Sequence, residues 1–191
     1  MRKQWFGDAR DYVKWNFIFT ESQPDYVVCY IAMARPDEIA THINPAVKAF
    51  FDKYKNLELA GEMFAGRFRT LLREYRARDS DAYFDEVKTL IIATQPSGKV
   101  VIFADPDTGV EPRGRATDKH IRLSDVHRIA RLLRNGDKLI IYQHAPIMRR
   151  PTWIQDSMDR ILAENWSGSF RLRHHFDLPC ASDVFFLVLE R

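Results

Sequence analysis

The run Val100-Val101-Ile102-Phe103-Ala104-Asp105-Pro106-Asp107-Thr108-Gly109 decides the fold of this chain. Residues 100–104 form an almost continuous apolar stretch, which is typical of a parallel strand that is buried on both faces. The stretch passes directly into Asp-Pro-Asp-Thr-Gly, in which proline fixes φ and aspartate and glycine suit a tight turn. The sequence therefore predicts a central buried strand that ends in a polar turn.

The segment that follows completes an α/β pattern. Residues 138–142 form a second apolar strand, and Val126, Ile129 and Leu133 give the segment between the two strands a helical spacing. A strand, a helix and a strand in this order make a right-handed parallel unit. We therefore expect a three-layer, Rossmann-like α/β fold with a mostly parallel sheet and helices on both faces.

The end of the chain predicts a hairpin. Residues 169–176 and 183–189 read as strands, and the few residues between them, which include Pro179, are too short for a helical crossover. Two strands joined in this way pair antiparallel. A helix that begins near Thr152 precedes the hairpin, with a capping-box spacing from Thr152 to Gln155.

The first half of the chain gives weaker patterns. Residues 25–33 read as a strand, and helices are expected after Asp8 and after Asn44-Pro45. A third helix is expected from the apolar spacing of Phe64, Phe68, Leu71, Leu72 and Tyr75. Residues 83–94 fit a helix or a strand, and their periodicity does not distinguish the two.

Composition sets the class of protein. Apolar residues make up 46% of the 191 residues, charged residues 29% and aromatic residues 13%, as in a folded protein, and the length favours a single domain spanning 1–191. The two cysteines, Cys29 and Cys180, have no spacing for a metal site or a disulfide framework. Because no signal peptide or membrane-spanning run is visible, a cytoplasmic protein is expected.

The polar ends of the two central strands are the candidate catalytic site. Ligands of open parallel sheets bind beyond the carboxyl ends of the strands, where Asp105, Asp107 and His144 are expected to meet. Two carboxylates and a histidine could act in acid–base chemistry, or hold Mg²⁺ or Mn²⁺ in a nuclease or phosphoesterase. An ordinary turn explains residues 107–109 as well, and a satisfied edge residue explains His144.

Further residues are expected around the same edge as substrate- or cofactor-binding groups. The segment Phe6 to Trp15 gathers charges and aromatic rings at a helix start and could close over the site, although ordinary capping by Asp8 also explains it. The predicted binding residues are Gly7, Asp8, Arg10, Asp11, Lys14, Pro106, Thr108, Gly109, Lys119, His120 and Gln143.

Clustered arginines indicate an anionic partner, although the net charge is only +3. One set is expected on the helix that contains Phe68, and the other on the helix before residue 138. If both helices face one side they could follow phosphates of a nucleic acid, whereas two solvated faces explain them equally. The arginines are Arg69, Arg73, Arg76, Arg128, Arg131 and Arg134, with Arg149, Arg150, Arg171 and Arg173 nearby.

From about residue 98 to 191 the chain resembles the second half of class I S-adenosylmethionine-dependent methyltransferases. Their fourth strand carries a motif beginning with Asp-Pro, and in amino-methylating members the first residue of that motif binds the target amine. Asp105 and Pro106 match this motif, while Asp107 and Thr108 replace its second proline and aromatic residue. The glycine-rich turn of that family has no counterpart at residues 33–38, which contain no glycine.

Most of the chain also looks like a bacterial family of unassigned activity, and it is distantly similar to the three-Cys-motif partner proteins. Three hypotheses follow from these patterns. The first is a methyltransferase that binds S-adenosylmethionine and acts on nucleic acid or a nucleotide, with Asp105 holding the target amine. The others are a divalent-metal nuclease that uses Asp105, Asp107 and His144, and a non-catalytic nucleic-acid-binding module on the same fold.

Overall fold

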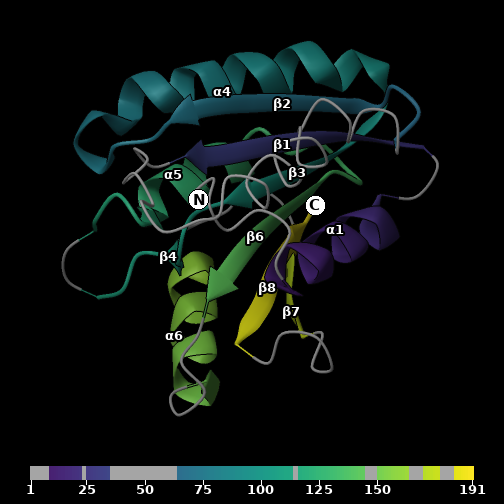
Figure 1. The fold of residues 1–191 in the computed structure, drawn as a ribbon. Coiled ribbons are helices and arrows are strands. Elements are labelled where there is room, and N and C mark those ends of the chain that lie inside the picture. The colour runs from purple at the N-terminus through teal and green to yellow at the C-terminus, as the bar shows by residue number, and fades with distance from the viewer. Residues whose placement is uncertain are drawn as a thin grey trace, which may run out of the picture.

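The computed structural model forms a mixed α/β fold in which one sheet carries helices on both faces (Figure 1). The α/β class and the mostly parallel sheet expected from the sequence are confirmed. The described residues are 9–22, 25–34, 64–113, 116–144, 150–163, 170–176 and 183–191.

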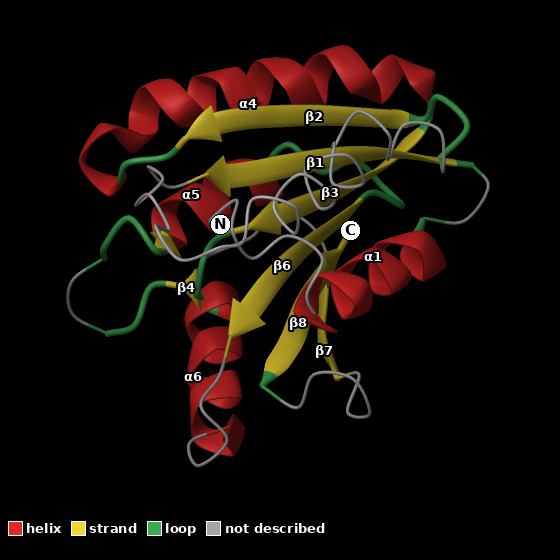
Figure 2. Ribbon diagram, in the orientation of Figure 1, coloured by secondary structure: helices red, strands yellow, loops and turns green. Residues whose placement is uncertain are grey.

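The sheet contains β1 (Tyr26–Ala34), β2 (Phe68–Glu74), β3 (Lys99–Asp105), β6 (Lys138–His144), β7 (Arg171–Phe176) and β8 (Val184–Glu190). The strands pair in the order β2-β1-β3-β6-β8-β7 (Figure 2). The first four in this order run parallel, whereas β8 runs antiparallel to both of its neighbours. The predicted C-terminal hairpin is therefore confirmed. The chain continues from β1 to β2 on one side of the sheet and from β3 to β6 on the other side. The order in which strands are added therefore reverses between β1 and β3.

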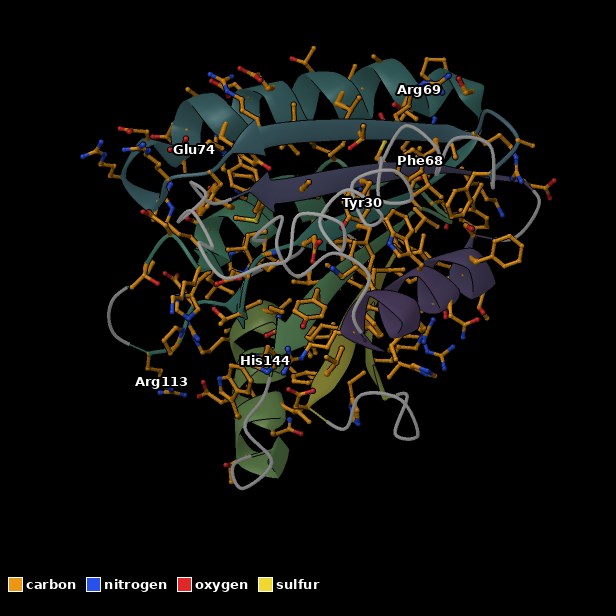
Figure 3. All side chains as sticks on the ribbon, in the orientation of Figure 1. Tyr30, Phe68, Arg69, Glu74, Arg113 and His144 are labelled. Atoms are coloured by element: carbon orange, nitrogen blue, oxygen red, sulfur yellow. The ribbon has the colours of Figure 1, made fainter. Side chains whose placement is uncertain are left out.

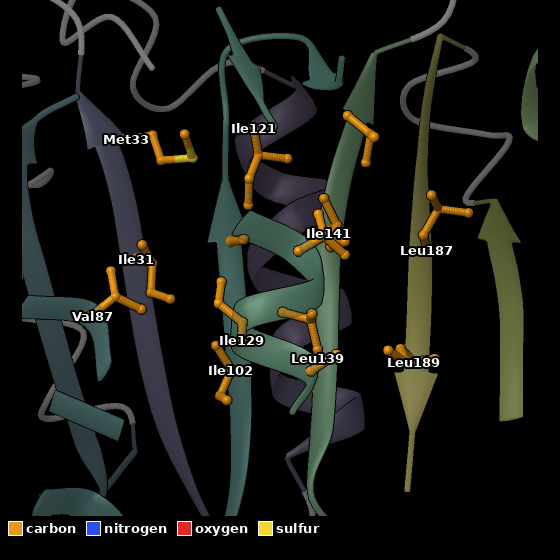
Figure 4. Packing of buried hydrophobic residues seen from close by; sticks show 14 of the residues in the cluster. Ile31, Met33, Val87, Ile102, Ile121, Ile129, Leu139, Ile141, Leu187 and Leu189 are labelled. Carbon is orange, nitrogen blue, oxygen red and sulfur yellow. The ribbon is translucent and has the colours of Figure 1, made fainter. Parts of the chain in front are cut away.

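Among the described residues, one helix packs on one face of the sheet and three pack on the other. The helix α1 (Ala9–Glu21) packs on one face, and α4 (Ser80–Thr94), α5 (Leu123–Ala130) and α6 (Arg150–Leu162) contribute to the core of the other. Figure 4 shows α5 and α1 on opposite sides of the strands. Short elements complete this part of the fold: β4 (Gly109–Val110), β5 (His120–Ile121) and the 3₁₀ helices Ala77–Asp79 and Gln95–Ser97.

The central strand β3 explains why the apolar run is continuous. Val101 and Phe103 pack in the core under α1, whereas Ile102 and Ala104 pack in the core under α4 and α5. Successive side chains of a strand point to opposite faces, so a strand covered on both faces needs apolar residues at every position. Burying a side chain such as Phe103 contributes about 1.5–3 kcal/mol.

The helix expected around Phe68 is wrong, because Phe68–Glu74 forms strand β2. Its residues pair with β1 in parallel, with Phe68 opposite Val28. The apolar spacing fitted a helix because Phe68 and Leu71 pack in the two different cores that lie on either side of the sheet. Residues 83–94, which the periodicity left undecided, belong to α4.

The assignment of Phe68–Glu74 to a strand also changes where the predicted arginines lie. Arg69 and Arg73 lie on β2 rather than on a helix flank, and Arg73 pairs with Glu86 of α4. On α5, Arg128 forms ion pairs with Asp81 and Asp85 at 2.7 and 3.3 Å. The arginines therefore do not form one helical face, and at least two of them link neighbouring elements.

Some predictions lie outside the described residues. These are the helix after Asn44-Pro45, the expected site residues Gly7 and Asp8, and Arg149 of the arginine set. Within the described ranges, the helices are too short or too polar to cross a membrane.

Candidate functional site

The candidate site lies at the carboxyl ends of the parallel strands, at the point between β1 and β3 where the order of strand addition reverses. Asp105 is the last residue of β3 and pairs in register with Ala32 of β1. Its side chain is only 1% exposed. Since ligands of open α/β sheets bind at this position, a buried charge here makes Asp105 a candidate for a functional residue.

Two side chains from other elements bind Asp105. Lys14 of α1 donates to Oδ2 with a distance of 2.9 Å between Nζ and the oxygen, and the hydroxyl of Tyr30 on β1 donates to the same oxygen. Lys14 itself is 5% exposed at its side chain, so both charges of the pair are buried. The sequence predicted Asp105 and Lys14 at one site, and the structure brings them into direct contact.

Aromatic rings hold this pair in place. Tyr30 stacks on Phe103 and on Trp15, with centroid distances of 5.5 and 5.0 Å. Lys14 Nζ lies 5.0 Å from the ring centroid of Tyr142 on β6, a cation–π arrangement. Burial raises the pKa of Tyr142, so its hydroxyl remains protonated at neutral pH although the Lys14 charge favours ionisation.

A second charged cluster lies at the end of β6. Nε2 of His144 is 2.7 Å from Oδ2 of Asp183, the residue that precedes β8, and Arg10 of α1 donates to the same oxygen at 2.7 Å. Burial alone would raise the pKa of Asp183, but the hydrogen bonds from Arg10 and His144 outweigh it and hold the pKa at about 2. His144 and Asp183 are 36% and 25% exposed at their side chains, so this cluster is more open than the first.

The two clusters share one face of the sheet and one helix. On β6, Tyr142 and His144 point to the same face because they are two positions apart. On α1, Arg10 and Lys14 are four positions apart and lie on one side of the helix. Figure 3 shows His144 at the end of β6 and Tyr30 within β1, beside the helix that carries both cations.

Gln143 points to the other face and explains Gly109. Its side chain is buried, and its Oε1 accepts a hydrogen bond from the Val110 amide at 3.1 Å. A Cβ at Gly109, where φ is +119°, would lie 2.1 Å from that oxygen, so glycine is required. Nε2 of Gln143 has no hydrogen-bond partner among the described residues.

The rest of the Asp-Pro-Asp-Thr-Gly turn serves the short strands β4 and β5. The amide and the hydroxyl of Thr108 both donate to the carbonyl of Lys119 at 2.9 Å, and the Thr108 carbonyl accepts from the His144 amide at 3.0 Å. These bonds fasten the turn between β5 and β6. Pro106 is buried and Asp107 is half-buried in the same turn.

His120 lies beside this turn. Its Nδ1 is 2.9 Å from the hydroxyl of Thr117. Burial lowers the pKa of His120, while the nearby carboxylates of Glu111 and Asp107 act in the opposite direction and Lys119 adds to the lowering. Lys119 is exposed.

The structure does not support the metal alternative. Within the described ranges, no group of three or more histidine, cysteine or acidic side chains is arranged to hold an ion. Asp105 binds Lys14, and His144 binds Asp183. Asp11 lies on α1, where its backbone is helical.

Three residues at this edge were not identified from the sequence. Asp183 precedes an antiparallel strand, and the amino end of such a strand lies at the same edge as the carboxyl ends of the parallel ones. Glu74 ends β2 opposite Ala34 of β1, but the helix expected there concealed it (Figure 3). Tyr30 shares the face of Val28 by strand alternation, a signal that was available once the strand was recognised.

No protein-family model matches the chain, and no curated protein matches it. A chain in the crystal structure of a fibrillarin/Nop5p complex is similar at 15% identity and a TM-score of 0.46, over 95% of this chain and 84% of that one. A candidate rRNA methylase from Clostridium thermocellum is similar at 12% identity and a TM-score of 0.40, over 97% of this chain and 98% of that one.

Proposed function

We propose that this protein is an S-adenosylmethionine-dependent methyltransferase that acts on a nucleic acid or a nucleotide. The observation that carries the proposal is the buried pair of Lys14 and Asp105 at the point where the sheet changes direction. Replacing a buried ion pair by apolar residues is often neutral or stabilising, so stability is a weak reason to keep one. Because the pair lies where ligands bind in this fold, a role in ligand binding or catalysis explains it better.

Asp105 is placed to hold a target amine. Both of its hydrogen bonds end on Oδ2, and within the described ranges none reaches Oδ1. A carboxylate oxygen with a free lone pair accepts a hydrogen bond from the amino group of a base. Lys14 and Tyr30 then act as positioning residues, because they fix the plane of the carboxylate. The following Pro106 agrees with the Asp-Pro motif of amino-methylating enzymes.

Glu74 is the described residue that best fits the cofactor. A carboxylate at the end of the strand next to β1 is the group that binds ribose hydroxyls in dinucleotide-binding sheets, and Glu74 ends β2 in that position. Its side chain is 43% exposed and accepts a hydrogen bond from Arg76 at 2.5 Å. When bound, S-adenosylmethionine supplies an electrophilic methyl group. Because residues 33–38 contain no glycine, this acidic contact has to contribute more of the affinity.

Exposed cations near the edge favour a polyanionic substrate. Lys119 is exposed beside the turn that follows β3. Arg113 lies in the same segment between β4 and β5. Its side chain is 77% exposed and pairs with Asp156 of α6. Lysine and arginine side chains bind phosphates in nucleic acids mainly through charge.

The test combines binding with methyl transfer. Calorimetry should detect S-adenosylmethionine binding to the wild type and weaker binding to Glu74→Gln, because one acceptor of the ribose is lost. Radiolabelled cofactor, incubated with RNA and DNA pools, should label one of them, and Asp105→Asn should reduce the rate by about 100-fold or more while retaining cofactor binding.

Asp107→Asn is the matched control. It removes a charge from the same turn and should leave methyl transfer within a few-fold, because Asp107 is not part of the Lys14–Asp105 pair. A wild-type protein that binds no S-adenosylmethionine would contradict the proposal. Hydrolysis of nucleic acid in Mg²⁺ that disappears in Asp107→Asn would support the nuclease instead.

A further inference from the structure

The second cluster, Arg10, His144 and Asp183, has a geometry that the proposed function has not used. One nitrogen of the His144 ring, Nε2, is bound to Asp183, while no described residue bonds to Nδ1. The ring is partly exposed, at 36% of its side chain. A histidine anchored by a carboxylate at one nitrogen and open at the other is the arrangement of a general base.

We infer that His144 and Asp183 form a dyad that accepts the proton of the target group during methyl transfer. The inference rests on the proposed methyltransferase activity and adds to it a residue, Asp183, and a role. In this dyad His144 is the catalytic residue, and Asp183 is a positioning residue that holds the ring with its proton on Nε2. Nδ1 is then the nitrogen that takes up the proton.

The placement of the dyad agrees with this role. In the β3–β6 pairing Phe103 is opposite Ile140, so Asp105 is level with Tyr142, and His144 lies two residues further out on the next strand. With a strand spacing of ~4.8 Å and a rise of ~3.3 Å per residue, the two Cα atoms are roughly 8 Å apart. Asp105 and His144 therefore lie on neighbouring strands at the same edge and on the same face of the sheet.

Arg10 offsets the negative charge of the Asp183 carboxylate that lies beside His144. Its Nε and Nη2 atoms reach Asp183 at 3.2 and 2.7 Å, so the carboxylate is already neutralised by a permanent cation. The hydrogen bond to Asp183 orients the ring of His144. The charged and titratable groups nearest to this cluster include Tyr142 on the same strand, Lys14 from α1, Asp105 from β3 and Tyr30 from β1.

The proposed step is balanced without any other reactant. The lone pair of the target nitrogen or oxygen forms the bond to the methyl carbon, and the electron pair of the broken carbon–sulfur bond stays on sulfur. The proton of the target atom moves to Nδ1 of His144, and the resulting imidazolium keeps its hydrogen bond to Asp183. Release of this proton to water restores the neutral ring.

The first experiment reads the ring directly, without any turnover. Heteronuclear NMR of the ¹⁵N-histidine-labelled protein should show that the neutral form of His144 carries its proton on Nε2, and Asp183→Ala should shift that form to a mixture of tautomers. A ring protonated on Nδ1 in the wild type, or a tautomer unchanged by Asp183→Ala, would overturn the inference.

The second experiment measures catalysis with and without added imidazole. His144→Gly should bind S-adenosylmethionine as the wild type does but lose about 100-fold or more in methyl transfer, and imidazole in the buffer should restore part of the rate. The control is His174→Ala, which removes an exposed histidine of β7 and should leave the rate unchanged.

The outcomes separate the inference from the proposed function. Full activity of His144→Gly beside an active wild type would overturn the dyad and leave the methyltransferase standing. Lost activity that imidazole does not restore would assign His144 a structural role and also overturn the dyad. A wild type that transfers no methyl group would overturn both.

Discussion

Asp105 and Asp137 are equally buried but are held in different ways. Asp137 precedes β6 at the amino edge of the sheet and accepts hydrogen bonds from the backbone amides of Val100 and Arg134, at 2.8 and 2.9 Å, besides a longer ion pair with the exposed Arg134 side chain at 3.2 Å. Asp105 ends β3 at the carboxyl edge, and the described groups that bind it are the side chains of Lys14 and Tyr30.

The difference separates a carboxylate that is bound at both oxygens from the one that we propose binds a ligand. Backbone amides are present whatever the side chains are, and they tie Asp137 to the start of the strands. Asp105, in contrast, needs a lysine on a helix and a tyrosine on another strand, so two specific residues must be present to bind it. They also leave one oxygen of Asp105 for a ligand, whereas both oxygens of Asp137 are bound.

The largest effect on stability is expected from Lys14→Met. It leaves the Asp105 carboxylate buried without its cation, and breaking a buried pair in this way destabilises proteins by about 3–5 kcal/mol. Urea unfolding would measure the loss. The double variant Lys14→Met/Asp105→Leu should regain most of the stability yet remain inactive, and a double variant as unstable as the single one would contradict this reading of the pair.

A somewhat smaller effect is expected from Asp137→Ala. The buried amide of Val100 and the partly buried amide of Arg134 would lose their acceptor, at about 1–3 kcal/mol for a buried group left unsatisfied. Urea unfolding should show the loss, while calorimetry should find cofactor affinity unchanged in the folded protein. Weakened cofactor binding would contradict the division between the two aspartates.

Asp183 gives a pH-dependent effect that is smaller again. Its pKa falls from 3.8 to about 2 on folding, so its contribution to stability is present above pH 4 and is lost as the pH falls towards 2. The unfolding free energies of the wild type and Asp183→Asn should therefore converge over this range. The difference at neutral pH should be under about 1 kcal/mol, because Arg10 and Asp183 are partly solvated. Parallel curves from pH 5 to pH 2 would count against this assignment.

The smallest effect is expected from Arg73→Ala on the outer strand. Arg73 and Glu86 are 51% and 45% exposed at their side chains, and exposed ion pairs contribute about 0.5 kcal/mol or less. Thermal unfolding and methyl transfer should both remain close to the wild type. A large fall in nucleic-acid binding would instead show that Arg73 contacts the substrate.

The central part of the fold could be predicted from the sequence because its signals are local. The apolar run before Asp105 needs burial on both faces, and the short connection before β8 permits an antiparallel pairing alone. Strand β2 could not be predicted in this way. It lies at the edge of the sheet, where Arg69 and Arg73 are exposed, so the continuous apolar pattern of a central strand is missing.

The candidate site was predicted in part. Asp105, Lys14 and His144 were expected from their positions after strands and at a helix start, and the structure adds their partners. Sequence spacing carries no information about Tyr30 or Asp183 as partners, because these contacts depend on which strands become neighbours. The face of the sheet on which α1 packs is likewise set by tertiary contacts and cannot be seen in the local sequence pattern.

The contacts of α1 also bear on how the site is made. Lys14 meets a carboxylate 91 positions later in the chain, and Arg10 meets one 173 positions later. Contacts of such long sequence separation form late in folding, after the sheet has brought the strand ends together. During synthesis the two cations therefore leave the ribosome long before either carboxylate exists. A nascent chain can acquire its second cluster only after Asp183 has emerged, so copies that end before Asp183 lack that cluster.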